Sequence, residues 1–455
     1  MIGKILAFAL IAGSPAALAQ AATGKLVVHE WGTFTSFQDE RGATIAGINV
    51  DDEPVPKFVH RLGDVPIFTR TSLPATWSQG APRCHPDVTM RLETPVLYFY
   101  PPDDWIPVPI DVHASFVGGW LTEFFPAADS NDAGFPETID AAARSSLSWR
   151  GLQLNPGSAA KALLPVTDAH VWLAPRNVAA ATVANPATRE AEKYLFYRGV
   201  GNLDAPIIVS REGNTLNFSL RDGASDLEVL PRLWLVDVGR DGHLFLKVVK
   251  PTGRTAQAPA FTFAVAGAWN NRLGLERELA DALKTSGLRA DEAAAMLDTW
   301  KLSYFESPGL RVFFLLPRSW IDAHLPLELS TPADITRVMV GRVELVTGEQ
   351  RATLAKLQSL PESDFPRMPI YGESMEVLAA MRRGDLSEVE LYRLAGRPVP
   401  SSLSLYDSLG RFRDALIAHA LTREEDPARR ARLEKITRYY GACYESGRLL
   451  QQQQP

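Results

Sequence analysis

Two pairs of alternating apolar segments, each joined by a short glycine-containing turn, constrain the fold of this chain most. PIIVSREGNTLNFSL (206–220) has its turn at Glu212 to Asn214, and RLWLVDVGRDGHLFLKVV (232–249) has its turn at Gly239 to Gly242. Short loops that contain Gly and Asn or Asp between alternating segments are typical of β-hairpins. Because consecutive hairpins give antiparallel strands, the pattern predicts a sandwich or a barrel.

The rest of the first half follows the same pattern. MRLETPVLYFY (90–100) is dense in β-branched and aromatic residues, and VPIDVHASFVGG (108–119) alternates apolar with polar side chains. We therefore predict a large antiparallel, β-sandwich-like domain over residues 20–265.

The second half is mixed. GLRADEAAAMLDTW (287–300) predicts a helix, LRVFFLLP (310–317) a buried strand, and ITRVMVGRVELV (335–346) another strand. Thr347 and Gln350 are spaced as a capping box that opens a further helix.

From residue 372 onwards the apolar spacing becomes helical. Leu405, Leu409, Phe412 and Leu416 fall on one face of a single predicted helix. The expected fold class is α+β. We expect a mixed α/β segment (266–360) packed on the β-rich domain, then a helical C-terminal region (361–450) and a disordered tail (451–455).

Residues 1–19 have the three parts of a cleavable secretory signal peptide. Lys4 is followed by an apolar stretch (5–13) and by the cleavage signal Ala17-Leu18-Ala19. The apolar stretch is shorter than the roughly 20 residues that cross a hydrocarbon layer of about 30 Å. We expect a periplasmic or secreted protein without stable membrane insertion.

Charge and cysteine content fit that compartment. The net charge is −6, and removal of Lys4 would make it −7. This argues against a nucleic-acid partner, which needs a basic surface. Cys84 and Cys443 are the only cysteines. They could form one disulfide in an oxidising compartment, or they could remain two thiols, since sequence does not show whether their Cα atoms lie within about 7 Å.

Several catalytic signatures are missing from the sequence. It contains no G-x-S-x-G, no G-x-x-x-x-G-K-[ST], no H-E-x-x-H and no C-x-x-C. Their absence argues against serine hydrolases of the α/β type, P-loop NTPases and zincins. Enzymes whose catalytic residues are scattered along the chain remain open.

Histidines are concentrated near the N-terminus. His29, His60, His85 and His113 are four of the eight in the chain. Imidazole is a common metal ligand, so His29, His85 and His113 with a carboxylate could hold a divalent metal that keeps an open position for water. The alternative is that each is an ordinary hydrogen-bonded residue, since their wide spacing matches no compact ligand motif.

Two charged residues interrupt apolar strands. Glu93 lies within 90–100, and Arg198 lies within KYLFYRGVGN (193–202). A carboxylate in such a position needs a partner or has a raised pKa. Glu93 is either the ion-pair partner of Arg91 or a catalytic carboxylate. Arg198 either pairs with a carboxylate or binds an anionic ligand.

The segment KLVVHEWGTFTSF (25–37) raises a similar question. On a regular strand His29 and Trp31 share one face and Glu30 lies on the other, unless a bulge near Gly32 intervenes. We predict that His29 is catalytic together with Glu93 and His113, that Trp31 contacts a ligand, and that Glu30 is a buried group paired with an arginine.

Three blocks resemble one family. HEWGTFTSF, LETPVLYFY, and LRVFFLLPRSW followed by VGRVEL resemble, in the same order, uncharacterised secreted proteins of environmental bacteria. The resemblance touches roughly residues 27 to 346. It implies export and a shared fold, and it implies no activity.

Two functions follow as hypotheses. The first is an extracytoplasmic enzyme, such as a metal-assisted hydrolase. The second is a non-catalytic sugar-, peptide- or envelope-binding protein, for which the ten tryptophans could supply stacking surfaces. Buried polar residues in strands cost stability and need a reason, and this favours the enzyme. Either would take a small-molecule or polymer ligand.

Overall fold

The structure is a computed structural model that describes residues 24–50, 54–62, 77–131, 138–155, 164–221, 230–251, 255–259, 271–365, 374–377, 379 and 388–440. The predicted leader, Cys443 and the predicted tail lie outside the described residues. The predicted Cys84–Cys443 disulfide therefore stays a prediction.

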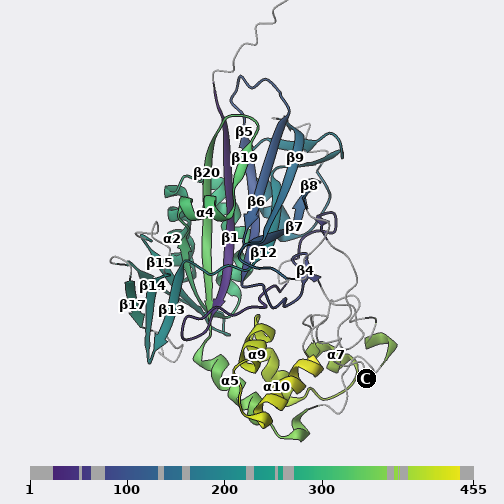
Figure 1. Cartoon of the computed structure of the whole chain (residues 1–455), viewed down its shortest axis with the longest axis vertical. Coiled ribbons are helices and arrows are strands. Elements are labelled where there is room, and N and C mark those ends of the chain that lie inside the picture. Colours follow the sequence, from purple (N-terminus) through teal and green to yellow (C-terminus); the bar gives the residue numbers. More distant parts are fainter. Residues whose placement is uncertain are drawn as a thin grey trace, which may run out of the picture.

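A nine-stranded sheet runs through the centre of the molecule (Figure 1). In spatial order its strands are β16 (Leu244–Val249), β15 (Leu233–Val238), β18 (Gly309–Leu315), β20 (Ala333–Leu345), β1 (Leu26–Gln38), β5 (Met90–Tyr100), β12 (Leu195–Gly201), β7 (Gly119–Phe125) and β2 (His60–Arg61). All neighbours are antiparallel except β1 and β20, which run parallel along their whole length.

Three smaller sheets accompany the central one. The six-stranded sheet consists of β11 (Glu190–Glu192), β10 (Thr182–Asn185), β9 (Arg144–Asn155), β6 (Ile110–Val117) and β19 (Leu327–Leu329), with β8 (Asp129–Ser130) paired to β9. The others are β13 (Ile207–Glu212), β14 (Thr215–Leu220) and β17 (Thr255–Pro259), and the short pair β3 (Trp77–Ser78) and β4 (Ala81–Pro82).

The helices fall into two groups. Those beside the sheets are α1 (His170–Leu173), η2 (Ala174–Asn177), α2 (Arg272–Thr285), α3 (Ala290–Thr299), the π-helical turn η3 (Leu302–Glu306) and α4 (Arg318–His324). Those of the C-terminal region are α5 (Gly348–Ser359), η4 (Glu362–Asp364), α7 (Glu388–Leu394), α8 (Ser401–Ser408), α9 (Arg413–Leu421) and α10 (Pro427–Tyr440). None of the described helices is long and apolar enough to span a membrane.

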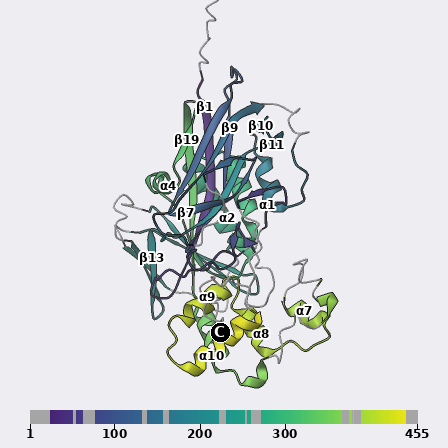
Figure 2. The same cartoon turned by 45° about the vertical axis from the view of Figure 1, so that its right-hand side comes forward.

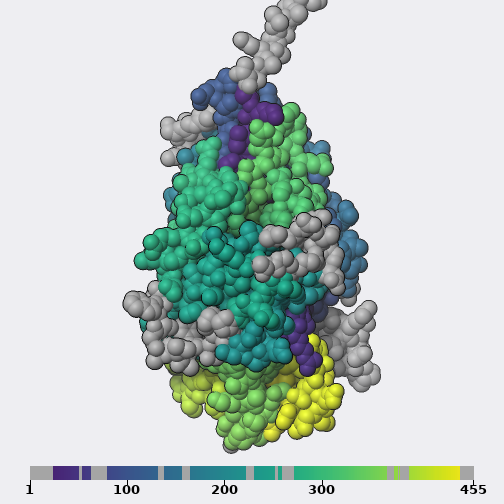
Figure 3. Space-filling model, turned by 90° about the vertical axis from the view of Figure 1, so that its left-hand side faces the viewer, coloured from purple at the N-terminus to yellow at the C-terminus, as the bar shows by residue number. Residues whose placement is uncertain are grey.

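Three apolar cores hold these layers together. The first lies between the central sheet and the smaller sheets. The second lies between the opposite face of the central sheet and helices α2 and α3; Figure 2 shows α2 beside the strands. The third joins the C-terminal helices to one end of the sheets. These helices lie below the strands in Figure 1 and form the lower end of the molecule in Figure 3. The fold class is α+β, as predicted.

The elements that depend on turn residues and helix caps were predicted correctly. β13 and β14 form a hairpin in which Glu212 pairs with Thr215, and β15 and β16 form the second predicted hairpin. The capping box at the start of α5 is present. The segment 266–360 supplies β18 and β20, so it completes the central sheet as well as packing on it.

The single helix expected around Leu405 to Leu416 is wrong. The chain forms α8 and α9 with a break between them, and Gly410 in that break has a φ of +85°. A left-handed residue ends a helix, and glycine adopts this conformation without steric cost. Leu409, Phe412 and Leu416 still share one apolar core, which is why their spacing mimicked one helix face.

β1 lies in the middle of the central sheet, between β20 and β5. β1 pairs with β20 without a shift, so it has no bulge at Gly32; the register shift against β5 comes from an extra residue in β5, because Trp31 pairs with Val96 and Thr33 with Glu93. His29 and Glu30 therefore lie on opposite faces: Trp31 packs in the helix-side core, while Val28 and Phe34 pack in the core between the sheets.

Candidate functional site

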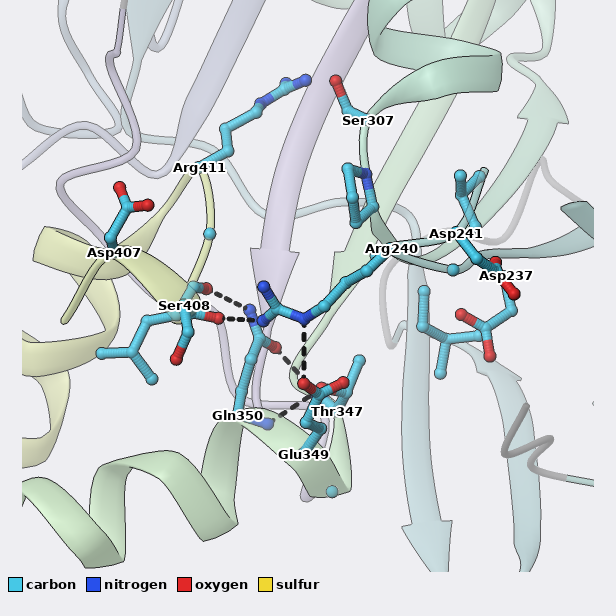
Figure 4. Close-up of a pocket in the computed structure, with 18 of the residues that line it drawn as sticks. Asp237, Arg240, Asp241, Ser307, Thr347, Glu349, Gln350, Asp407, Ser408 and Arg411 are labelled. Atoms are coloured by element: carbon cyan, nitrogen blue, oxygen red, sulfur yellow. Dashed lines mark hydrogen bonds and ion pairs between the residues drawn. The ribbon is translucent and has the colours of Figure 1, made fainter. Parts of the chain in front are cut away.

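A pocket of about 650 Å³ lies where the ends of several strands meet the C-terminal helices (Figure 4). We call it the junction pocket. Its walls are residues 237–241 of β15 and the following turn, 307–310 before and at the start of β18, 347–350 at the start of α5, 407–411 between α8 and α9, and Arg211 of β13. Ligand sites are typically pockets of about 300–1,000 Å³ with a few convergent polar groups.

The β15–β16 turn forms one wall of the junction pocket. Gly239 donates its amide to the carbonyl of His243 at 2.9 Å, and Gly242 donates to the carbonyl of Gly239 at 3.0 Å. Gly242 has a φ of +80°, a conformation that favours glycine. The tight turn fixes the direction in which Arg240 and Asp241 leave the sheet.

The N-terminus of α5 forms the opposite wall. The Thr347 hydroxyl accepts the backbone amide of Gln350 at 3.1 Å, and the side-chain Oε1 of Gln350 accepts the backbone amide of Thr347 at 2.9 Å. The Gln350 side-chain amide also donates to the carbonyl of Leu409 at 2.8 Å, which ties α5 to the α8–α9 connection. The positive end of the helix dipole is therefore held at the pocket wall.

Arg240 connects the two walls. Its Nε lies 2.9 Å from a carboxylate oxygen of Glu349, and its Nη2 donates to the carbonyl of Ser408. Figure 4 shows this side chain extending from the hairpin towards α5 and α8. Since both ion-pair partners are largely exposed, the contact is a weak link across the pocket.

Asp237, at the end of β15, is the buried acid of the pocket. The residue is 8% exposed, and its carboxylate forms no hydrogen bond or ion pair within the described part of the chain. Burial raises the pKa of the Asp237 carboxyl to about 7. The positive charges of Arg311 and Arg211 oppose this rise in pKa, and the negative charge of Glu349 adds to it.

The two arginines near Asp237 differ in how they are engaged. Arg311 is 1% exposed, forms an ion pair with Glu344 at 3.2 Å and donates to the carbonyl of Ser307 at 2.7 Å. Burial lowers the pKa of its guanidinium. Arg211 lines the pocket, and its buried Nε has no hydrogen-bond partner among the described residues. Of these two arginines, Arg211 is therefore the one that remains available to a ligand.

The chemistry of the junction pocket follows from these groups. A buried carboxyl group that titrates near neutral pH can give up or take a proton. An arginine and a helix N-terminus beside it favour negative charge. A carboxyl group of this kind beside cations marks a candidate catalytic or binding site.

His29 lies elsewhere, on the helix side of the central sheet. Its Nδ1 is 2.8 Å from Glu292 of α3, and the other carboxylate oxygen of Glu292 accepts the hydroxyl of Tyr100 at 2.7 Å. The Arg289 guanidinium stacks 3.5 Å from the centre of the Tyr100 ring. Burial, with the negative charge of Glu292, raises the pKa of Tyr100 far above its usual range. These contacts join β1 and β5 to α3.

Glu93 and Arg198 both have ion-pair partners. Glu93 is 1% exposed, and one of its oxygens lies 2.9 Å from Arg91 and 3.2 Å from Arg342. Arg198 is 3% exposed and pairs with Glu123. These contacts favour the ion-pair alternative for both residues, and their catalytic and ligand-binding roles stay predictions.

His113 and His85 do not share partners with His29. His113 lies on β6 in a shallow pocket, where its ring nitrogens are 2.9 Å from the hydroxyl of Ser148 and 3.2 Å from that of Ser115. His85 is 1% exposed and its Nδ1 accepts the amide of Asp87 at 3.2 Å. The described residues contain no group of three or more His, Cys, Asp or Glu placed to hold a metal ion.

Trp31 is fully buried and its ring packs 6.1 Å from that of Tyr98. An indole in that position cannot stack on a ligand unless the core opens. Cys84 is buried, with a φ of +56°, and its Sγ lies 4.0 Å from a carboxylate oxygen of Asp414.

Asp237 was the residue that sequence reasoning missed. It interrupts the apolar strand LWLVDV as Glu93 interrupts its own strand, so the same rule about buried carboxylates could have singled it out. Nothing in the local sequence indicates that Arg211 lies beside it, because that contact depends on how separate sheets pack.

Comparisons with known proteins identify no family. No family model matches the chain, and no curated protein matches it. Among solved structures it is similar to the Fcho1 Mu homology domain from Danio rerio with a bound Eps15 peptide. That match has 10% identity and a TM-score of 0.26, and covers 70% of this chain and 97% of that one. A likeness this weak supports no inference about function.

Proposed function

We propose that this protein is an exported hydrolase that acts in the junction pocket with Asp237 as its general acid–base group. The observation that carries the proposal is a carboxyl group that is 8% exposed, lines a pocket of about 650 Å³ and forms no hydrogen bond within the described residues. A pKa of about 7, raised by burial, suits proton transfer near neutral pH.

In each reaction cycle Asp237 gives up one proton and takes one back. In its protonated form Asp237 gives its proton to the leaving-group oxygen as the bond to that oxygen breaks. Water supplies the hydroxyl group that completes the other product, and its remaining proton returns to Asp237. The buried position keeps bulk water from competing for the proton, and Arg211 holds the substrate beside the acid.

Export is supported by the leader-like residues 1–19 of the sequence. The mass of the protein recovered from the periplasm or the medium tests this part, since cleavage should leave Gln20 as the first residue. Metal assistance by histidines is a separate proposal, and metal analysis of the purified protein tests it.

Hydrolysis is tested with a panel of chromogenic esters and glycosides and two matched variants. Asp237→Asn should lower kcat by about 10²–10⁴-fold, the usual contribution of a general acid–base group. Asp241→Asn should leave kcat near the wild-type value, because Asp241 lines the same pocket but is exposed. The pH profile of kcat/KM should have a limb near pH 7 that is absent from Asp237→Asn.

A non-catalytic binding protein predicts a different result. Ligand would bind in the junction pocket, no substrate of the panel would be turned over, and Asp237→Asn would change binding alone. Equal kcat values for the Asp237→Asn and Asp241→Asn variants would also refute the catalytic role of Asp237.

A further inference from the structure

We infer that the junction pocket binds an anionic group of its ligand, a carboxylate, sulfate or phosphate, between Arg211 and the N-terminus of α5, and that Asp237 takes up a proton as this group binds. The inference rests on the proposed function, because it assigns a ligand class to the same pocket.

Arg211 and the start of α5 are neighbours. The Nη1 atom of Arg211 lies 3.8 Å from the position that a Cβ atom on Gly348 would occupy, and Gly348 is the first residue of α5. The first amides of a helix have no partner within the helix, and they point towards an anion placed at its end. In α5 the Thr347 hydroxyl already accepts the Gln350 amide, which leaves the amides of Gly348 and Glu349 for a ligand. The guanidinium and these amides would therefore contact the same anionic group.

Arg211 is suited to this role because no acidic side chain of the described residues forms an ion pair with its positive charge. The residue is partly buried, its Nε has no hydrogen-bond partner, and its side chain forms no ion pair with the described residues. A buried cationic donor without a partner is costly. A ligand oxyanion would pair with the guanidinium through its Nη atoms, which are not closed off as Nε is.

Asp237 is the second polar group in the junction pocket that forms no hydrogen bond or ion pair with the described residues. The charged groups that face Asp237 are Arg311 from β18, Arg211 from β13 and Glu349 from α5. The other charged groups that line the pocket are Arg240, Asp241, Asp407 and Arg411.

Several of these charges are already matched. Glu349 is paired with Arg240 at 2.9 Å, and Asp407 lies 3.4 Å from Arg413. The surroundings of Asp237 are therefore dominated by two arginines. They favour an incoming anion over an ammonium group, provided that Asp237 itself carries no charge.

The protonation state of Asp237 decides whether an anion fits. As a carboxylate, it repels an anion in this buried site; as a carboxylic acid, it donates an O–H to it. Anion binding therefore favours the protonated form, and the affinity should fall as the pH rises through about 7, the raised pKa of this buried carboxyl. If only the protonated form binds, the affinity falls roughly 30-fold between about pH 6 and about pH 8.5.

Isothermal titration calorimetry with sodium sulfate and with sodium glucuronate tests the inference. Both anions keep a constant charge over this pH range, so only protein groups contribute to the pH dependence. Titrations in buffers of different ionisation enthalpy count the protons taken up, and we expect about half a proton per anion at about pH 7 and close to one at about pH 8. Binding of sulfate alone indicates a sulfated or phosphorylated ligand, and binding of glucuronate alone indicates a carboxylated one.

Three variants locate the site. Arg211→Gln should weaken binding about tenfold or more. Arg150→Gln should leave the affinity unchanged, because Arg150 is exposed and pairs with Asp129 on the six-stranded sheet, which does not line the junction pocket. Asp237→Asn removes the charge but keeps the shape, so it should bind the anion equally well at both pH values.

Three results would overturn the inference: no saturable binding of either anion, a wild-type affinity independent of pH, or equal affinities for the Arg211→Gln and Arg150→Gln variants. The number of protons that the wild type takes up per bound anion tests the inference even if Arg211→Gln does not fold. Hydrolysis of neutral substrates without inhibition by either anion would overturn this inference and leave the proposed function standing. Anion binding with proton uptake but without turnover would support this inference and overturn the proposed function.

Discussion

Replacing Glu30 by alanine should destabilise the folded protein by about 3–4 kcal/mol. The Glu30 side chain is fully buried, and it accepts from Nε of Arg337 at 2.5 Å and from the hydroxyl of Tyr197. Breaking a buried ion pair costs about 3–5 kcal/mol, because the remaining charge is left uncompensated. Arg337 keeps Asp322 at 2.8 Å, which places this loss at the lower end, and the stranded Tyr197 hydroxyl adds about 1 kcal/mol.

Urea unfolding followed by tryptophan fluorescence measures this loss, and the same pair of strands supplies the control. Lys25 of the chain just before β1 and Asp334 of β20 form an exposed ion pair at 3.2 Å. Asp334→Ala should cost less than about 1 kcal/mol. The double variant Glu30→Leu/Arg337→Leu should recover most of the stability, since it leaves no buried charge unpaired.

A loss for Glu30→Ala within about 1 kcal/mol of that for Asp334→Ala would refute this reasoning. It would mean that the Glu30 site is open to water in solution. A double variant as unstable as Glu30→Ala would show that packing, and not charge, sets the cost.

Three further predictions follow from the described contacts. Asp237→Asn should be more stable than the wild type at about pH 8, by up to about 4 kcal/mol, and no more stable at about pH 4. This follows because burial raises the pKa of this carboxyl to about 7, so ionisation costs folding free energy as the pH rises from about 4 to 7; thermal unfolding at both pH values checks it. Tyr100→Phe should cost about 1–3 kcal/mol in urea unfolding, because the buried Glu292 carboxylate loses a donor at 2.7 Å, and an unchanged midpoint would show that water replaces the hydroxyl. Arg240→Ala should leave global stability within about 1 kcal/mol but speed amide hydrogen exchange in residues 407–411, because an exposed ion pair contributes little while the contact with Ser408 holds that loop; equal exchange would contradict this link.

Patterns that depend on neighbouring residues were predictable. The hairpins at Glu212 and Gly239 follow from turn residues between alternating segments, and the capping box at Thr347 follows from side chains three residues apart. The position of Glu30 implied an arginine partner, and that of Glu93 implied either an arginine partner or a catalytic role; both side chains pair with arginines. In each case the turn conformation, the helix cap or the cost of burying a charge depends on only a few neighbouring residues.

Partner identity was predictable only at short range. Arg91, two residues from Glu93 on one strand, was named as its partner, and the contact is present. Arg337 could not be named for Glu30, because it comes from a strand more than three hundred positions away that lies parallel to β1. A parallel pairing leaves no turn signature in the sequence, so the place of β20 beside β1 was invisible.

The sequence by itself determined most of the strands and helices, though not the break between α8 and α9, because alternation and turn residues are local properties. It also determined which charged residues would need partners, because the cost of burying a charge is local too. The tertiary structure alone decided where the candidate site lies. Asp237, Arg211 and the start of α5 come from separate segments of the chain, and no local pattern indicates that they meet. They form one pocket because the C-terminal helices pack against the ends of strands from two sheets, an arrangement set by the burial of apolar surface over the whole molecule.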